Sequence, residues 1–447
     1  MCSSDLMAPK TVRLAPGPTP LQMFRALQKV RTDTTGYLAD VHRTYGDMVQ
    51  FPVPTPAVSI NNVTAVDRVL RTNAKNYTKH TLQYGSLKLV TGEGLLTSDG
   101  EIWKAHRRAL QPAFHRTLQN LTVSAIEDSY AHFASDWRTA RTIEVAQAMQ
   151  HVTLEVVGRS LFGASLSGSA DVIARATLKA LEVVVAKARM PLPIPLSIPT
   201  PNNIRLKSAV SALDAAVREL MASPAAHPDA FITLLREAHE ADPQKFDVAA
   251  VRDEIVTFIV AGHETVASAL TWTLHFLQSH PASLEAVVQE ARSGVDTSDL
   301  AQIPLAVAAY AEALRLYPPA WLITRQSIEE DELCGITMPP KSLIIMSPYL
   351  LQRTERWSEP EKFDLSRFLG DTNSQVARPD YLPFGLGARL CIGRDMALVE
   401  GPLLLSKMLR DFDIQPTTDW ATVGVTNGVT LHPTRAMGAR LTPTNLG

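Results

Sequence analysis

The chain has 447 residues, of which 45% are hydrophobic and 20% are charged, and its formal net charge is -2. This length and apolar content suffice to bury one large core or two ordinary ones. The near-neutral charge, with no long run of lysine or arginine, gives no electrostatic reason to expect nucleic acid or an anionic membrane as a partner.

Cysteine is scarce, and the three residues Cys2, Cys334 and Cys391 form no CxxC pair. A disulfide framework and a cysteine-rich zinc site are therefore not supported. The N-terminus lacks the charged and apolar blocks of a signal peptide, and no stretch approaches the roughly 18 uninterrupted apolar residues of a membrane span. We expect a cytoplasmic protein without a membrane anchor.

The N-terminal half begins with an irregular, proline-rich lead over residues 1–20. The runs VQFPVP and AVSI, between Asp47 and Asn62, are short and broken by prolines, which is typical of edge strands in a small sheet. From Trp103 to about His280 the pattern is mostly helical. It is interrupted by PLPIPLSIPTPNN over residues 191–203, whose prolines predict an extended loop.

The longest predicted helix runs from about Val248 to Ser279, with Asp247 as N-cap and Pro281 as the stop. At 1.5 Å per residue it would be roughly 45 Å long. Its middle, IVTFIVAG over residues 255–262, is apolar on all sides, so we expect a central helix that is buried all round.

A run of polar residues, AGHET (261–265), lies inside this apolar helix. Gly262 costs about 1 kcal/mol against alanine there, and the buried carboxylate of Glu264 needs a partner. Thr265 can bond back to the carbonyl of Ala261 and open a local bulge, a feature that often marks functional sites. The alternative is a helix kink with a capped polar pair. A lone helical histidine is usually a satisfied side chain, so we do not take His263 as a ligand.

A second strong helix covers about Pro304 to Tyr317 and ends at a Pro-Pro pair. After it, LITRQS, CGITM and SLIIMS predict strands, and Leu398 to Phe412 predicts another helix. Because no internal repeat or linker divides the chain, we expect residues 1–447 to form a single domain, mainly α with a smaller β-rich part.

The segment FGLGARLCIG (384–393) surrounds one cysteine with three glycines and an arginine. A thiolate is a soft donor that suits iron, and it must be held rigidly and supplied with backbone N–H groups to ligate haem. Glycines leave room for a flat macrocycle, and Arg389 can reach an anionic carboxylate. The alternative is a buried, inert Cys391 in a glycine-rich turn.

The spacing Phe384-x-x-Gly387-x-Arg389-x-Cys391-x-Gly393 resembles the haem-binding signature of the cytochrome P-450 family. The resemblance runs from about residue 45 to the C-terminus. It implies the cytochrome P-450 fold, with haem b between the long central helix and the helix that follows the cysteine loop, and with Cys391 as the axial thiolate and metal ligand.

The same resemblance assigns roles to further residues. Thr265 and Glu264 would be the catalytic pair that relays protons to dioxygen. Glu312, Arg315 and Arg367 would form a buried structural triad, although the meander has LSRF where many relatives have PERF, and Glu312 and Arg315 alone would suit a solvated surface bridge. The cofactor-binding residues would be Trp103, Arg107 with His106 as its alternative, Ala261, Gly262, Arg325, Phe384, Gly385, Arg389, Cys391 and Gly393.

The function implied is that of a monooxygenase. One oxygen atom of O2 would enter a lipophilic small molecule, such as a terpene, polyketide or fatty acid, in a pocket formed by Ile259, Ala261, Ala320, Trp321, Leu322, Ile323 and Val429. Electrons would come from a separate ferredoxin or flavodoxin with its reductase, because the chain lacks a GxGxxG fingerprint. A monomer is expected. A haem-binding sensor, a haem-free protein and a peroxygenase or isomerase are the alternatives.

Overall fold

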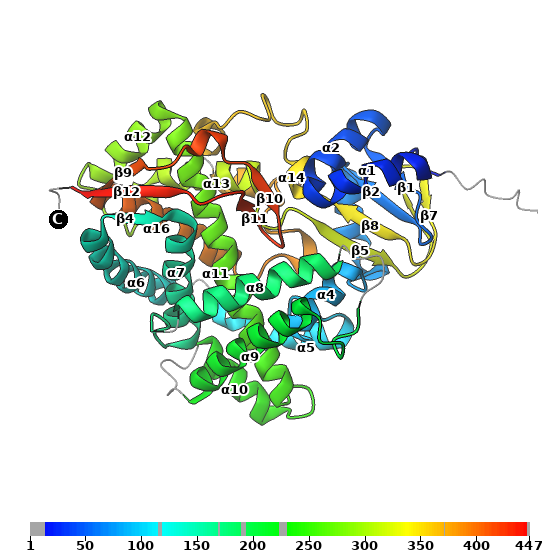
Figure 1. The fold of residues 1–447 in the computed structure, drawn as a ribbon, viewed down its shortest axis with the longest axis horizontal. Coiled ribbons are helices and arrows are strands. Elements are labelled where there is room, and N and C mark those ends of the chain that lie inside the picture. Colours follow the sequence, from blue (N-terminus) through cyan, green and yellow to red (C-terminus); the bar gives the residue numbers. More distant parts are fainter. Residues whose placement is uncertain are drawn as a thin grey trace, which may run out of the picture.

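The computed structural model describes residues 14–114, 119–168, 170–188, 194–222, 230–370 and 372–444. The helices are α1 (Pro20–Thr32), α2 (Thr34–Tyr45), α3 (Val63–Asp67), α4 (Leu82–Thr91), α5 (Gly100–Leu110), α6 (Gln119–Ala140), α7 (Val145–Val157), α8 (Ala170–Ala188), α9 (Pro201–Ala222), α10 (Phe231–Ala241), α11 (Val248–Ser279), α12 (Pro281–Arg292), α13 (Pro304–Leu316), α14 (Pro348–Leu351), α15 (Thr372–Val376) and α16 (Arg394–Asp411). The expectation of a mainly α fold is confirmed (Figure 1).

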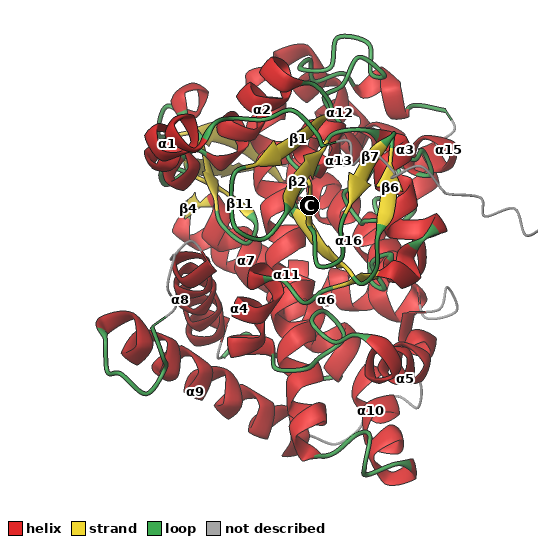
Figure 2. Ribbon diagram, turned by 90° about the vertical axis from the view of Figure 1, so that its right-hand side faces the viewer, coloured by secondary structure: helices red, strands yellow, loops and turns green. Residues whose placement is uncertain are grey.

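The strands are short. They are β1 (Met48–Phe51), β2 (Ala57–Ile60), β3 (Tyr77–Thr78), β4 (Thr142–Glu144), β5 (Ile323–Ser327), β6 (Asp331–Leu333), β7 (Ile336–Met338), β8 (Leu343–Met346), β9 (Phe412–Pro416), β10 (Val425–Asn427), β11 (Leu431–Pro433) and β12 (Gly438–Pro443). Five of them form one sheet in the order β1-β2-β8-β5-β3, in which only β2 and β8 run parallel. Figure 2 shows these strands in yellow beside α1 and α2.

The central helix α11 forms as expected from its sequence. The Asp247 carboxylate accepts a hydrogen bond from the N–H of Ala250 at 2.7 Å and so caps the first turn. Ile255, Val256 and Ile259 are fully buried. Among the described residues α11 is the one helix long and apolar enough to cross a membrane, but 83% of its apolar window is buried inside the protein. It is therefore the helix at the centre of the core.

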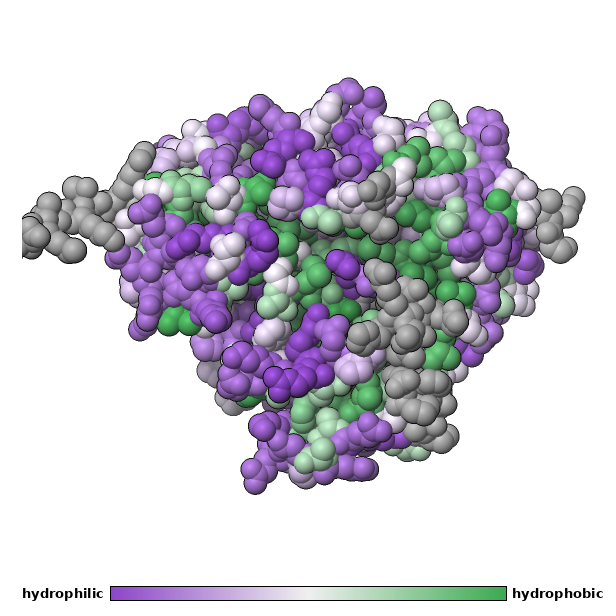
Figure 3. All heavy atoms as spheres, turned by 180° about the vertical axis from the view of Figure 1, so that it is seen from behind, coloured by the Kyte–Doolittle hydropathy of each residue, from purple (hydrophilic) through white to green (hydrophobic). Residues whose placement is uncertain are grey.

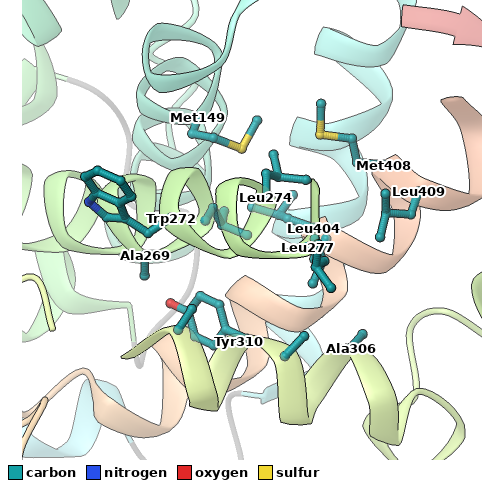
Figure 4. Packing of buried hydrophobic residues seen from close by; sticks show 14 of the residues in the cluster. Met149, Ala269, Trp272, Leu274, Leu277, Ala306, Tyr310, Leu404, Met408 and Leu409 are labelled. Carbon is teal, nitrogen blue, oxygen red and sulfur yellow. The ribbon is translucent and has the colours of Figure 1, made fainter. Parts of the chain in front are cut away.

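Helices α7, α13 and α16 pack around α11. Figure 4 shows the contact at close range: Ala269 and Leu277 of α11 point towards Tyr310 and Ala306 of α13. Leu274 points to the other side, towards Met149 of α7 and Met408 of α16. This packing fixes α11 against the helix that follows the cysteine loop.

Three sequence expectations differ from the structure. AVSI is an interior strand, since β2 lies between β1 and β8, and the prolines that suggested an edge fall in the turn between β1 and β2. Helix α9 already begins at Pro201, because proline is well tolerated in the first helical turn. Helix α16 begins at Arg394, four residues before the predicted start. Residues 1–13 of the lead and 191–193 of the proline segment lie outside the described residues.

Candidate active site

A cavity of about 300 Å³ lies between α11, the cysteine loop, α5 and β5. Its lining includes the thiol-bearing Cys391 from the loop and Thr265 from α11. Arginines from α5, β5 and the loop also line it. Residues that are far apart in the sequence therefore surround a single internal space.

The cysteine loop is a tight backbone structure that presents Cys391 to this cavity. The N–H of Cys391 donates to the carbonyl of Phe384 at 2.9 Å, and the N–H of Leu390 donates to the carbonyl of Gly387 at 3.0 Å. Gly387 has φ +73°, and a Cβ there would lie 2.2 Å from the carbonyl oxygen of Leu70. Only glycine fits this position.

The surroundings of the Cys391 thiol change its pKa through opposing effects. Burial raises the pKa of Cys391, whereas the backbone N–H of Gly393 and the charges of Arg107 and Arg394 lower it. Burial is the largest of these effects, so the pKa of Cys391 lies above its ordinary value, and the N–H group and the two cations offset part of that rise. A bound metal ion would favour the thiolate, which is the form that ligates it.

On α11, Ala261, Gly262 and Thr265 line the cavity. The Thr265 hydroxyl donates to the carbonyl of Ala261 at 2.9 Å, as the sequence predicts. The helix nevertheless stays α-helical from Val248 to Ser279, so the predicted bulge is absent from α11. A Cβ at residue 262 would lie 2.8 Å from Cγ2 of Val157, so glycine permits the close packing of α7 on α11.

Glu264 does not line the cavity. Its side chain is 2% exposed and lies on another side of α11, where Gln150, Thr430 and His432 contact its carboxylate. Burial raises the pKa of Glu264, but the hydrogen bond and charge of His432, together with His263 and Thr430, hold it below the ordinary value. Glu264 is therefore ionised at neutral pH.

Cations gather along one edge of the cavity. Arg389 donates to the carbonyl of Ser98 at 2.7 Å and to the carboxylate of Asp99, and its guanidinium lies 4.0 Å from the centre of the Trp103 ring. Arg107 donates to the carbonyl of Leu390 at 3.0 Å. Arg325 donates to the hydroxyl of Tyr84 at 3.2 Å.

Lys79 joins this edge although the sequence analysis did not assign it a role. It is 7% exposed, lines the cavity and donates to the carbonyl of Leu96 at 2.6 Å. Burial, followed by repulsion from Arg325 and Arg389, lowers its pKa well below the ordinary value. Burial also lowers the pKa of Arg389 to about 10. Both shifts disfavour the charged forms of these side chains, and an anionic group bound beside them would offset that effect.

His106, the predicted alternative to Arg107, lies elsewhere. It is 2% exposed, its Nδ1 is 2.6 Å from Oε1 of Glu254, and its ring stacks on Phe246. Adjacent positions on α5 point in different directions, so Arg107 faces the cavity and His106 faces the interior between α5 and α11.

The structure brings the predicted triad together. Arg315 donates to both oxygens of Glu312 at 2.7 and 2.8 Å, and Nε of Arg367 donates to Glu312 at 3.2 Å. Arg315 and Glu312 are fully buried, so they do not form a solvated surface bridge.

A family model described as cytochrome P450 matches residues 15–437. The chain belongs to the cytochrome P450 family. The match starts before residue 45, where the sequence resemblance was placed, and so includes α1 and α2. The protein is thus a cytochrome P450 monooxygenase.

Individual relatives agree with this assignment. The chain is 33% identical, over 74% of its length and 75% of the relative, to cyclooctat-9-en-7-ol 5-monooxygenase of Streptomyces melanosporofaciens. It is 29% identical to pentalenene oxygenase of Streptomyces avermitilis, over 89% of its length and 90% of the relative. The crystal structure of CYP175A1 from Thermus thermophilus superposes with a TM-score of 0.79 at 32% identity, covering 95% of this chain and 99% of that one.

The residues present fit the haem that the family implies. The thiol of Cys391 faces a cavity with backbone and cationic groups around it, and four basic residues that line the same cavity, Lys79, Arg107, Arg325 and Arg389, could pair with the carboxylates of such a cofactor. A P450 of this family carries a haem-thiolate cofactor, and this site has the donors to hold it.

The predicted substrate residues separate into two groups. Ala261, Ala320 and Ile323 line the cavity. Ile259, Trp321, Leu322 and Val429 do not: Ile259 is fully buried in the core, and the indole N–H of Trp321 donates to the carbonyl of Gly428 at 2.9 Å, which draws Trp321 to the β10–β11 turn.

Other apolar residues line the cavity in their place. They come from the segments before and after α5, from α7 and its C-terminal turn and from α11, and they are Leu95, Leu96, Phe114, Val157, Leu161, Phe258 and Val266. Of these residues, the sequence analysis included none among the predicted pocket residues. The spacing of apolar residues along α7 shows that the helix is buried, but it does not show which of them face α11 and which face the cavity.

Proposed function

We propose that this P450 uses haem b to insert one oxygen atom of O2 into a terpenoid. The observation that carries the proposal is that Cys391 and Thr265 line one cavity whose remaining α7 and α11 wall is apolar apart from the hydroxyl-bearing Thr257. Such a lining favours a lipophilic guest with few polar groups. The relatives named for cyclooctat-9-en-7-ol and pentalenene support the terpenoid class.

Each residue has a distinct task in this proposal. Cys391 would ligate the haem iron through its thiolate, and Lys79, Arg107, Arg325, Arg389 and Trp103 would hold the carboxylate-bearing edge of the cofactor. The haem, when bound, supplies the activation of O2 that lets one atom enter a C–H or C=C bond.

The remaining steps belong to side chains of this protein. Thr265 would hold a proton at its hydroxyl on the cavity side of α11, and Glu264 would deliver protons to that side of the helix. The apolar side chains of α7 and α11 would orient the guest and exclude water. Gly262 would let α7 pack closely on α11 at the wall of the cavity.

Electrons would come from a ferredoxin or flavodoxin with its reductase, and the protein would act as a cytoplasmic monomer. Arg108 is exposed on α5, and Lys104 of the same helix is exposed and paired with Glu101. These cations would attract an acidic electron carrier.

The test is a reconstituted reaction. The purified holoenzyme would be supplied with a ferredoxin, its reductase, NADPH and ¹⁸O2, and offered cyclic terpene hydrocarbons in parallel with fatty acids. We expect a terpenoid product that carries one ¹⁸O atom, and no such product from Cys391→Ala. Oxygenation of fatty acids alone would contradict the terpenoid class, and turnover with peroxide but not with the carrier would favour a peroxygenase.

A further inference from the structure

The β10–β11 hairpin places a histidine against Glu264. Figure 1 shows the hairpin, in red, descending beside α11. The carbonyl of Leu431 accepts hydrogen bonds from Ser268 at 2.7 Å and from the indole of Trp272 at 3.0 Å, which fixes the hairpin to the helix. His432 follows directly, and its Nε2 lies 2.9 Å from Oε1 of Glu264.

Hydrogen bonds link this pair into a small network. The hydroxyl of Thr430 lies 3.0 Å from Oε1 of Glu264 and 2.8 Å from Nε2 of His432. The amide of Gln150 donates to Oε2 of Glu264 at 3.3 Å. Both carboxylate oxygens therefore have partners, and these partners are not among the residues that line the cavity.

One of these partners reaches solvent. Of the four side chains that the described structure places around Glu264, His263, Gln150 and Thr430 are buried, whereas the His432 side chain is 26% exposed. His263 is poorly placed for transfer, because its Nε2 is 3.9 Å from the carboxylate and its Nδ1 already contacts the carbonyl of Ile259.

Charges on the neighbouring elements favour a protonated His432. Burial lowers its pKa, but the hydrogen bond and charge of Glu264 on α11, with a further contribution from Glu182 on α8, raise it above the ordinary value. The other titratable group next to the pair, His263, loses affinity for protons through burial, which lowers its pKa. Of the two histidines beside Glu264, His432 is therefore the one that is more readily protonated.

We propose that His432 is the residue that takes protons from solvent and passes them to Glu264. The inference rests on the proposed function, in which Glu264 supplies protons on the Thr265 side of α11. The imidazolium of His432 gives its Nε2 proton to the carboxylate, which leaves neutral imidazole and neutral acid, and bulk water returns one proton to the imidazole. No electrons move, and one proton enters for each proton delivered.

After it has been protonated, Glu264 must deliver the proton towards the cavity, and its orientation determines how. Since the carboxyl does not line the cavity, it must rotate away from His432 and Thr430 to deliver its proton. Protonation by His432 neutralises both members of the pair and weakens the attraction that holds the carboxylate in place, so proton transfer and rotation are coupled. His432 is accordingly a positioning and proton-supplying residue, and it acts through Glu264.

The variant His432→Gln tests the role, because glutamine can keep a donor near Glu264 but does not titrate. His280→Gln is the matched control: His280 is half-buried at the start of α12, and its Nδ1 contacts only the carbonyl of Phe276 at 2.8 Å. We expect His432→Gln to lower coupled product formation about 10-fold or more, to flatten its pH profile and to raise the solvent isotope effect. Substrate affinity and haem content should match those of the control.

A second readout does not depend on turnover. Nitrogen-15 NMR of the holoenzyme reports the pKa of the His432 imidazole, which we expect above 6.5 in the wild type and lower in Glu264→Gln. An imidazole that titrates at or below its ordinary value would overturn the proposal, as would a wild-type rate and pH profile in His432→Gln. If the wild-type holoenzyme oxygenates none of the substrates, the proposed function fails, but the NMR titration still tests the His432–Glu264 pair. If the wild type and His432→Gln oxygenate equally well, only the role of His432 fails.

Discussion

Replacing Arg315 by alanine should destabilise the protein more than any other single change in the triad. Arg315 is fully buried and donates to both oxygens of Glu312. It also donates to the carbonyls of Gln352, Pro360 and Lys362 at 2.9, 2.7 and 3.1 Å, so it ties α13 to the segment that precedes the cysteine loop. Arg315→Ala leaves a buried carboxylate and three carbonyls without this donor.

The expected size follows from these contacts. Removing one partner of a buried ion pair costs about 3–5 kcal/mol. Nε of Arg367 and the N–H of Asp364 still donate to Glu312, so we place the loss within that range rather than above it. Because folded proteins are stable by only about 5–15 kcal/mol, such a loss is a large fraction of the total.

Urea unfolding of the haem-loaded protein measures the loss, and Lys362→Ala is the control. Lys362 pairs with Glu359 at the surface, where both side chains are more than half exposed, so its loss should cost about 0–1 kcal/mol. Arg315→Lys should be intermediate, since one ammonium does not replace a guanidinium fork. A loss below about 1 kcal/mol in Arg315→Ala, with wild-type haem content, would refute the reasoning.

Three further predictions concern the reaction and its surroundings. Thr265→Ala should raise peroxide release per reductant consumed several-fold, because Thr265 lines the cavity and supplies a hydroxyl there; tight coupling would contradict its role in holding a proton. The raised pKa of His432 and the lowered pKa of Glu264 stabilise the fold most between about pH 4.5 and pH 6.5, which are the ordinary pKa values of the two groups. The difference in unfolding free energy between wild type and His432→Gln should therefore be largest in this window and shrink at higher pH. A difference that does not change with pH would argue against an ion pair. Charge reversal of Lys104 and Arg108 should slow reduction by an acidic ferredoxin and weaken its salt dependence, and unchanged rates would exclude this docking surface.

Local sequence signals identified the parts of the site that depend on backbone sterics. The glycines around Cys391 were informative because Gly387 has a positive φ and a close backbone neighbour. The ends of α11 followed from the Asp247 cap and from Pro281, which begins α12. These constraints act within a few residues and are visible in the sequence.

Long-range pairings were not visible in the same way. Lys79 gains its significance from Arg325 and Arg389, and His432 from Glu264, which come from distant segments that only the fold brings together. Trp321 and Val429 were placed in the pocket, whereas Trp321 binds the turn beside Val429 and neither residue lines the cavity. Polar and apolar patterns do not encode such contacts. Figure 3 shows a related effect on the back of the molecule, where hydrophobic residues lie next to one another among hydrophilic ones at the surface.

The central claim is that Cys391 holds haem iron through its thiolate in the cavity that Thr265 lines. The most direct measurement is the visible spectrum of the purified, reduced protein exposed to carbon monoxide, with Cys391→His as the comparison. The account predicts a Soret band shifted strongly to long wavelength in the wild type and lost in the variant. A histidine-like band in the wild type, or a protein that binds no haem, would contradict it.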